Sequence, residues 1–243
     1  MRKLIMGLGL VAIAAINACK STDPTDPGDG RNRVLFIGNS YLYTKNIPAI
    51  FQELAAATGD QFRTVSVAGP DMALYDHLQH GGALAEITKG NWSYIVLQQG
   101  PSAVWYNRDS LRKATAIYDN LARQVNAKTA LFSAWPQQQH SADFPHAIES
   151  YRLAAQDVGG LFMPVASAWL KAWELDPSLR LYEDGLHPTQ EGAYLAALVV
   201  YASIVKKSPV GLPYSAGGVT IEDAKATILQ MAAASVTGYA GPE

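Results

Sequence analysis

The strongest indication of the fold is the segment Arg33-Val34-Leu35-Phe36-Ile37-Gly38. A short, unbroken apolar run that stops at glycine predicts a strand buried on both faces. Strand-like runs and segments with helical spacing then alternate along the chain. Further strands are expected at 62–67, 94–97, 129–132 and 161–163. Helices are expected at 47–58, 72–79, 83–89, 111–126, 144–158, 165–173, 189–205 and 220–235.

Strands that alternate with helices are typical of a parallel sheet flanked by helices on both faces. Ligands of such sheets bind beyond the carboxyl ends of the strands. Ser40, Gly69, Gln98–Gly100 and Trp135 each follow an expected strand closely. We therefore expect these residues to meet at one edge of the sheet, although about a hundred positions separate them.

The first 31 residues are typical of export and tethering segments. A basic start precedes an apolar run over 4–16, which is too short for a membrane-spanning helix of ~20 residues. Cys19, the only cysteine, follows Ile16-Asn17-Ala18, which resembles a bacterial lipobox. We expect a lipoprotein signal peptide over 1–18, a lipidated Cys19 that starts a polar tether over 19–31, and a folded domain over 32–239. The alternative is an ordinary signal peptide with an incidental cysteine.

The charge balance argues against nucleic acid as a partner. The chain has 19 basic and 21 acidic residues; without residues 1–18, which hold two basic and no acidic residues, 17 basic and 21 acidic ones remain. Nucleic-acid-binding proteins usually carry a basic footprint instead. The expected partners are an ester substrate, a small molecule or a glycan, and a membrane reached through the lipid anchor. This predicts a protein of the cell envelope, held at the outer membrane or cell surface.

Three residues form a candidate nucleophilic site. Asp184 and His187 lie three positions apart before an expected helix, and Ser40 follows the first expected strand. A serine nucleophile needs an imidazole to accept its proton and a carboxylate to orient that imidazole. Taken singly, Ser40 also fits a turn or helix-capping serine, and Asp184 and His187 fit a surface loop. The order of all three along the chain favours the catalytic interpretation.

These segments resemble the SGNH (GDSL-type) hydrolases. Gly38-Asn39-Ser40 is similar to the first block of a bacterial branch that has Gly-Asn-Ser, and Asp184-Gly185-Leu186-His187-Pro188 is similar to the last block. The resemblance covers roughly residues 33–236. It implies a flavodoxin-like three-layer α/β/α sandwich with a parallel sheet of about five strands. It also implies that Ser40 is the nucleophile, His187 the base and Asp184 its orienting acid, without metal or cofactor.

The same resemblance implies an oxyanion hole. Its donors would be the backbone N–H groups of Ser40 and Gly69 and one side chain from the third block. That block usually contains an Asn, whereas this chain has Gln98-Gln99-Gly100-Pro101-Ser102, which resembles the block of carbohydrate O-acetylesterases. Gln99 is the expected donor, and Gln98 and Ser102 are the alternatives.

The function expected from these features is a secreted, lipid-anchored serine esterase that removes O-acetyl groups from carbohydrate. The alternatives are a lipase or thioesterase for longer acyl chains, a glycan-binding lipoprotein without catalysis, and a structural envelope protein. Trp135 could stack on a sugar or belong to the core. His77 and His80 have a spacing that could hold a metal on one helix face, but no third ligand cluster follows.

Overall fold

The structure is a computed structural model that describes residues 32–100, 105–213, 215–216 and 219–239. The predicted signal peptide and tether over 1–31, with Cys19, lie outside the described residues, as does Ser102. Within the described ranges no helix combines the length and the apolar character needed to cross a bilayer.

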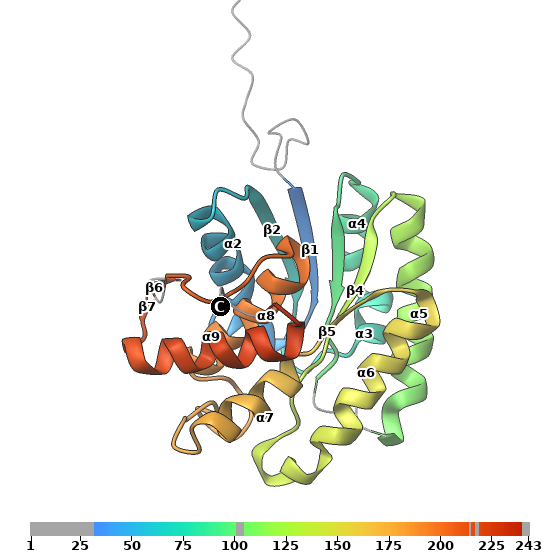
Figure 1. Ribbon diagram of the computed structural model, residues 1–243. Helices are drawn as coiled ribbons and strands as arrows, with labels where there is room; N and C mark the ends of the chain where they lie inside the picture. Colours follow the sequence, from blue (N-terminus) through green and yellow to red (C-terminus); the bar gives the residue numbers. More distant parts are fainter. Residues whose placement is uncertain (1–31, 101–104, 214, 217–218, 240–243) are drawn as a thin grey trace, which may run out of the picture. The chain divides into compact units, whose positions relative to one another are not determined.

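A five-stranded parallel sheet forms the centre of the folded domain (Figure 1). The strands follow the order β2-β1-β3-β4-β5, so the chain first moves to one side of β1 and then to the other. Crevices for ligands open at such a reversal, beyond the carboxyl ends of the strands. The strands are β1 (Asn32–Gly38), β2 (Phe62–Ala68), β3 (Tyr94–Leu97), β4 (Lys128–Phe132) and β5 (Leu161–Met163).

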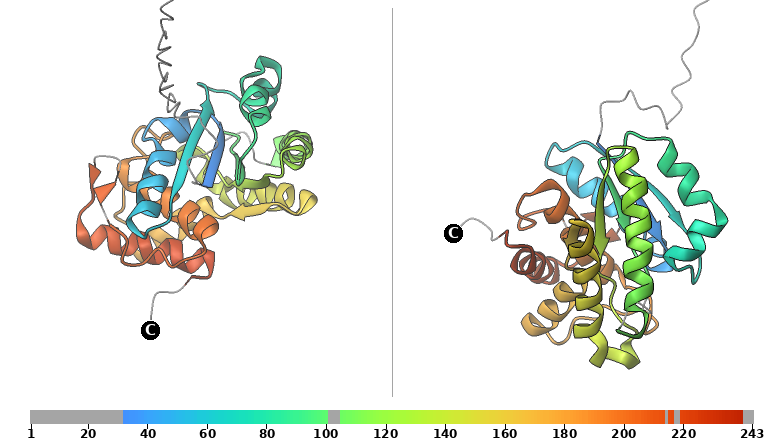
Figure 2. Two further views of the ribbon diagram at one scale, coloured as in Figure 1. Left: turned by 90° about the horizontal axis from the view of Figure 1, so that it is seen from above. Right: turned by 90° about the vertical axis from the view of Figure 1, so that its right-hand side faces the viewer.

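Helices cover both faces of the sheet (Figures 1 and 2). One layer holds α2 (Ile47–Ala57), α7 (Val165–Leu175), α8 (Gln190–Val205) and α9 (Asp223–Thr237). The other layer holds α3 (Leu74–His80), α4 (Gly82–Thr88), α5 (Arg108–Gln124) and α6 (Phe144–Val158). The predicted three-layer α/β/α fold with a flavodoxin-like strand order is confirmed.

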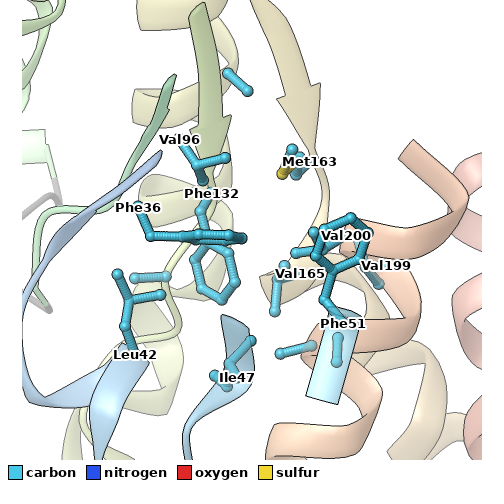
Figure 3. Packing of buried hydrophobic residues seen from close by; sticks show 14 of the residues in the cluster. Phe36, Leu42, Ile47, Phe51, Val96, Phe132, Met163, Val165, Val199 and Val200 are labelled. Carbon is cyan, nitrogen blue, oxygen red and sulfur yellow. The ribbon is translucent and has the colours of Figure 1, made fainter. Parts of the chain in front are cut away.

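The core between the sheet and the α2–α8 layer is built from apolar side chains of many segments (Figure 3). Helix α8 is buried almost all round, which explains why apolar residues fill its sequence rather than one stripe. Residues contributed by the strands, the helices and the turn after β1 are Phe36, Leu42, Ile47, Phe51, Val96, Phe132, Met163, Val165, Val199 and Val200. Burial of such side chains is the main favourable contribution to folding.

Most elements lie where the sequence predicts them, but two helix starts differ by three residues. Helix α5 begins at Arg108 rather than at 111, and α9 also differs. Thr189 caps α8 as expected, because its hydroxyl accepts the N–H of Gly192 at 3.2 Å. The last helix was expected to begin at Thr220, but Thr220 pairs in a short antiparallel ribbon and α9 begins at Asp223. That ribbon consists of β6 (Ser215–Ala216) and β7 (Val219–Thr220). Its strands of two residues are too short to show a period in the sequence.

Three further short helical segments, which the sequence did not predict, follow strands at the carboxyl edge of the sheet. They are α1 (Ser40–Tyr43) and two 3₁₀ helices, η1 (Trp105–Asn107) and η2 (Gln138–Asp143). None of them is long enough to show a helical repeat of apolar residues. They follow β1, β3 and β4, and α1 begins with the candidate nucleophile, Ser40.

The end of β1 requires glycine because two strands approach closely there. Gly38 pairs with Ala68 of β2, and Ile37 pairs with Leu97 of β3, so Gln98 lies beside Gly38. A Cβ atom on Gly38 would overlap Gln98 Oε1 and press on Leu42. The absence of a side chain at position 38 therefore lets β1 turn sharply into α1.

We predict that Gly38→Ala lowers the free energy of unfolding by about 1–3 kcal/mol, because the added methyl group overpacks a buried site. Urea unfolding followed by circular dichroism measures this change. Gly82→Ala is the matched control, since a Cβ there meets only Val67 Cγ1 at 3.7 Å. Equal stability of the two variants would contradict the close approach at Gly38.

Candidate active site

Ser40, His187 and Asp184 form one chain of hydrogen bonds. Ser40 Oγ lies 2.9 Å from His187 Nε2, and His187 Nδ1 lies 2.7 Å from Asp184 Oδ2. A carboxylate at Nδ1 keeps a proton on that nitrogen, which leaves Nε2 free to accept the serine proton. The structure thus brings Ser40 together with His187, which lies 147 positions further along the chain, and with Asp184, which is three positions before His187. The arrangement is suited to a serine nucleophile with its base.

The turn that carries Asp184 and His187 is fixed by its own backbone. Asp184 Oδ1 accepts the N–H groups of Leu186 at 2.9 Å and His187 at 2.7 Å. Gly185 has a φ of 83°, a left-handed conformation that glycine adopts without steric cost. The N–H of Glu183 also donates to the carbonyl of His187 at 2.9 Å and closes the loop. The geometry of the acid and base is therefore set locally, before any contact with Ser40.

The hydrogen bond with His187 lowers the pKa of Asp184 to about 2, and the two backbone N–H donors act in the same direction. The carboxylate therefore stays ionised at neutral pH and can stabilise a positive charge on His187. Because the pKa in the folded state lies below the ordinary value of 3.8, this contact stabilises the fold above that value. The stabilisation is lost as the pH falls toward 2. Asp184 is largely exposed, so solvent screening keeps the effect small.

Asn39 positions Ser40 through three contacts. Its backbone N–H donates to Gln98 Oε1 at 2.9 Å, and its side-chain Oδ1 accepts the N–H of Tyr41 at 3.2 Å as the cap of α1. Its Nδ2 group donates to the carbonyl of Met72 at 3.2 Å. An aspartate could not make this last contact, because a carboxylate has no proton to donate. The Asn of the Gly-Asn-Ser block therefore links the turn after β1 to the loop after β2.

A pocket of about 210 Å³ opens beside Ser40. Sequence reasoning missed most of its wall, because these residues carry no catalytic chemistry and come together only in the fold. The lining consists of Asn39, Ser40, Tyr41, Asp71, Met72, Ala73, Gly100, Gln137 and Leu186. Four of these residues lie in the motifs, Asn39 and Ser40 in the first block, Gly100 in the third and Leu186 in the last, so the motifs were the signal for these four.

The three expected oxyanion donors differ in burial and in the hydrogen bonds that they already make. Ser40 begins α1, and the described residues offer no acceptor for its backbone N–H. The N–H of Gly69 has an acceptor, the carbonyl of Gly38, at 3.3 Å. Gln99 is buried, and its backbone N–H donates to the hydroxyl of Tyr151 at 2.9 Å. Neither Gly69 nor Gln99 lines the pocket, so both assignments stay predictions.

The alternative donor Gln98 is also buried, with Oε1 bound to Asn39 as described above and Nε2 without a partner among the described residues. Gln98 therefore helps to position Ser40 indirectly, because it accepts the backbone N–H of Asn39, the residue before Ser40.

Trp135 belongs to the core and does not form an open face for a sugar. It is fully buried between Tyr41, with ring centroids 4.8 Å apart, and Trp169, with centroids 4.0 Å apart. Its Nε1–H donates to the carbonyl of Leu186 at 3.0 Å. The sequence places Trp135 correctly after β4, but the sugar-stacking interpretation is wrong. Its position supports the turn that carries His187.

A larger hollow of about 420 Å³ lies at the opposite edge of the sheet, where β3, β4 and β5 begin. Arg123, one of the basic residues that line it, already donates to Asp119 at 2.6 Å and to the carbonyl of Val158 at 2.8 Å. We therefore place the candidate reaction in the smaller pocket beside Ser40.

Solved structures of several bacterial proteins share the fold of this chain. A DUF4886 family protein from Bacteroides uniformis superposes with a TM-score of 0.75 at 19% identity, over 86% of this chain and 95% of that one. A candidate SGNH hydrolase from Slackia heliotrinireducens gives 0.60 at 25% identity, over 72% and 99%. A variant of an acetyl-xylooligosaccharide esterase from Geobacillus gives 0.52 at 15% identity, over 72% and 93%.

No family model matches the sequence, and no curated protein matches it either. The resemblance to the SGNH hydrolases that the motifs predicted is nevertheless confirmed by the solved structures. The neighbour at 25% identity supports a hydrolase as the class of this protein, and the other two share its fold.

His77 and His80 use ring nitrogens for structural contacts. His77 Nε2 lies 2.7 Å from the carbonyl of Gly38, and His80 Nδ1 lies 2.7 Å from the carbonyl of Asp76. The described residues hold no cluster of three His, Cys, Asp or Glu side chains that could bind a metal ion. His77 is buried, and this burial lowers its pKa. A neutral imidazole can donate its Nε2–H to Gly38, the residue two positions before Ser40.

We predict that His77 makes the fold less stable in mild acid. Since its pKa is lower in the folded than in the unfolded state, the unfolded state binds the extra proton, and stability falls as the pH drops below the unfolded value of about 6.5. Urea unfolding of the parent and of His77→Gln at about pH 7.5 and about pH 5 measures this dependence. The parent should lose more stability than His77→Gln over this interval. An equal loss in both proteins would show that His77 does not contribute.

Proposed function

We propose that this protein is a serine esterase whose nucleophile is Ser40, whose base is His187 and whose orienting acid is Asp184. The observation that carries the proposal is the continuous path from Ser40 Oγ to His187 Nε2 at 2.9 Å and from His187 Nδ1 to Asp184 Oδ2 at 2.7 Å. The path opens on a pocket at the carboxyl edge of the sheet. Fold and neighbours of the hydrolase class support the same assignment.

In the first half of the reaction Ser40 Oγ attacks the ester carbonyl carbon, and its proton passes to His187 Nε2. The tetrahedral intermediate then expels the alcohol, which leaves with the proton from Nε2, and an acyl-Ser40 ester remains. A water molecule attacks this ester in the second half, gives its proton to Nε2 and releases the acid. Return of that proton to Oγ regenerates Ser40.

The negative oxygen of the intermediate needs hydrogen-bond donors. We propose the backbone N–H of Ser40 as one donor, because the start of a helix leaves that group without an intrahelical partner. Gly69 and the Gln99 side chain remain the proposed second and third donors. Binding of the oxyanion by Gly69 would require its 3.3 Å hydrogen bond with Gly38 to be shared or exchanged.

The size of the pocket favours a short acyl group. A volume of about 210 Å³ lies below the roughly 300–1,000 Å³ that is usual for sites of drug-sized ligands. Met72 and Tyr41 contribute to its wall. We therefore propose acetyl as the acyl group and a carbohydrate as the alcohol. The likeness to an acetyl-xylooligosaccharide esterase supports this choice.

We further propose that the enzyme works in the cell envelope as a lipoprotein anchored through Cys19. The basic start, the apolar run and the lipobox-like residues before Cys19 support this proposal. The Pro-, Gly- and Asp-rich segment that follows has the composition of a flexible tether.

Removal of the nucleophile tests the proposed chemistry. The parent should react with a fluorophosphonate probe at one serine and hydrolyse nitrophenyl acetate, whereas Ser40→Ala should lose labelling and at least about 10⁴-fold in kcat. Asp184→Asn should lose roughly 10⁴-fold, because an amide donor facing Nδ1 favours the wrong tautomer of His187. Labelling that persists in Ser40→Ala would contradict the assignment.

A series of nitrophenyl esters in the same assay separates the alternative functions. Preference for acetate supports the short-chain esterase, and preference for acyl groups of about eight carbons or more would favour a lipase or thioesterase instead. A folded parent that neither reacts with the probe nor hydrolyses any ester would favour a glycan-binding or structural lipoprotein.

Substitution of the lipobox cysteine tests the anchor. We predict that the protein expressed in a bacterial host with its full sequence incorporates labelled fatty acid and sediments with membranes, and that Cys19→Ser abolishes both. Membrane association without fatty-acid incorporation in the parent, or unchanged labelling in Cys19→Ser, would overturn the proposal.

A further inference from the structure

A second, wider hollow of about 480 Å³ continues from the pocket beside Ser40. Gln137 and Leu186 line both spaces, so the two adjoin. The wider hollow lies between the turn that carries the candidate acid and the loop after β4. Its lining consists of Gln137, Gln138, Gln139, Asp184, Gly185 and Leu186.

The chemistry of the triad indicates which part of a substrate would occupy this hollow. In the proposed reaction, His187 Nε2 returns its proton to the departing alcohol, so the alcohol must lie against His187. The wall of the hollow includes the three residues that immediately precede His187. The small pocket beside Ser40 is then left for the acyl group. The alcohol extends along Gln137, Gln138 and Gln139 of the loop after β4, here called the glutamine loop.

Three consecutive glutamines make this wall rich in amide groups. Each side chain offers an amide donor and a carbonyl acceptor, which is the pair that a hydroxyl group can match. Gln138 and Gln139 are exposed and Gln137 is half-buried, so their amides face solvent in the free protein. An apolar alcohol would displace water from these amides and offer no hydrogen bonds in return. A polyhydroxy alcohol would replace the lost water.

The glutamine loop is held in place before any ligand arrives. The backbone N–H of Gln138 donates to the carbonyl of Gly185 at 2.8 Å, which ties the loop to the turn of Asp184 and His187. Gln139 Nε2 donates to Gln137 Oε1 at 3.1 Å, so the two amides orient each other. The hydroxyl of Tyr182 also donates to the carbonyl of Pro136 at 2.6 Å. A preformed polar wall loses little entropy when it binds a ligand.

We propose that Gln137 and Gln139 form a binding subsite for the alcohol part of the substrate, and that this subsite selects polyhydroxy alcohols such as sugars. The selection rests on the proposed esterase function, because the reaction defines which side of the ester lies against His187. The subsite itself is a binding feature of the described residues and can be tested without turnover.

The kinetic test compares two acetate esters on the purified full-length protein. We expect the double variant Gln137→Ala/Gln139→Ala to lower kcat/KM for mono-O-acetylated methyl β-xylopyranoside about 10- to 30-fold, as expected for two lost hydrogen bonds of about 1 kcal/mol each. Nitrophenyl acetate, whose leaving group has no vicinal hydroxyls, should lose several-fold less than the sugar ester. Gln124→Ala, an exposed glutamine at the end of α5, is the matched control and should leave both rates unchanged.

Equal losses on both esters, or no loss on the sugar ester, would overturn the subsite. The binding test uses Ser40→Ala and saturation-transfer NMR with unesterified methyl β-xylopyranoside. Transfer to the sugar should be present in Ser40→Ala and lost when the two glutamine substitutions are added. A parent without activity on nitrophenyl acetate would refute the esterase, whereas absence of transfer in Ser40→Ala would refute the subsite alone.

Discussion

The site depends on a stack of aromatic rings that joins its two halves. Tyr41, the residue after Ser40, lies parallel to Trp135, and Trp135 lies parallel to Trp169 of α7. All three rings are buried, and large buried rings contribute much of the energy of a core. Trp135 also donates its Nε1–H to the carbonyl of Leu186, next to His187. The same side chain therefore contacts the segment of the serine and the segment of the imidazole.

This stack explains why a turn near the end of the chain meets one near its start. The turn of Asp184 and His187 is shaped by its own hydrogen bonds, but those bonds do not direct it toward Ser40. A buried indole N–H without an acceptor is costly, so the hydrogen bond from Trp135 Nε1 fixes the position of the Leu186 carbonyl. His187 then lies edge-on to Tyr41, with ring centroids 6.3 Å apart, and its Nε2 reaches Ser40.

The parallel sheet supplies the second constraint. Because β1, β2 and β3 end in register, the residues after them lie side by side, and each contributes a different contact around the nucleophile. Gly38 allows the close approach, Gln98 receives the N–H of Asn39, and His77 from α3 reaches back to the carbonyl of Gly38. The catalytic side chain is thus carried by rigid elements, which favours a fixed geometry for reaction.

Apolar runs and repeats were sufficient to predict the sheet and nearly all of the longer helices. A strand buried on both faces leaves an unbroken apolar run, and a helix buried on one face leaves a repeat of 3.6 residues. It could not predict α1, the 3₁₀ turns or the β6–β7 ribbon, where too few residues are involved for a repeat to show. The motifs pointed to Ser40, Asp184 and His187, because their chemistry restricts the residue type. They did not point to the rest of the pocket wall, such as Asp71, Met72 and Gln137, because these residues come together only in the fold.

Residue types and spacing were enough to identify the fold class and the three residues that the structure connects by hydrogen bonds. Three features emerge only from the packed fold: Trp135 is buried beneath the site, the Gly69 N–H already has an acceptor, and Gln137 lines the pocket of Ser40. The difference arises because residue type and spacing are local properties. Burial and hydrogen-bond partners depend on which distant segments the packed core brings together.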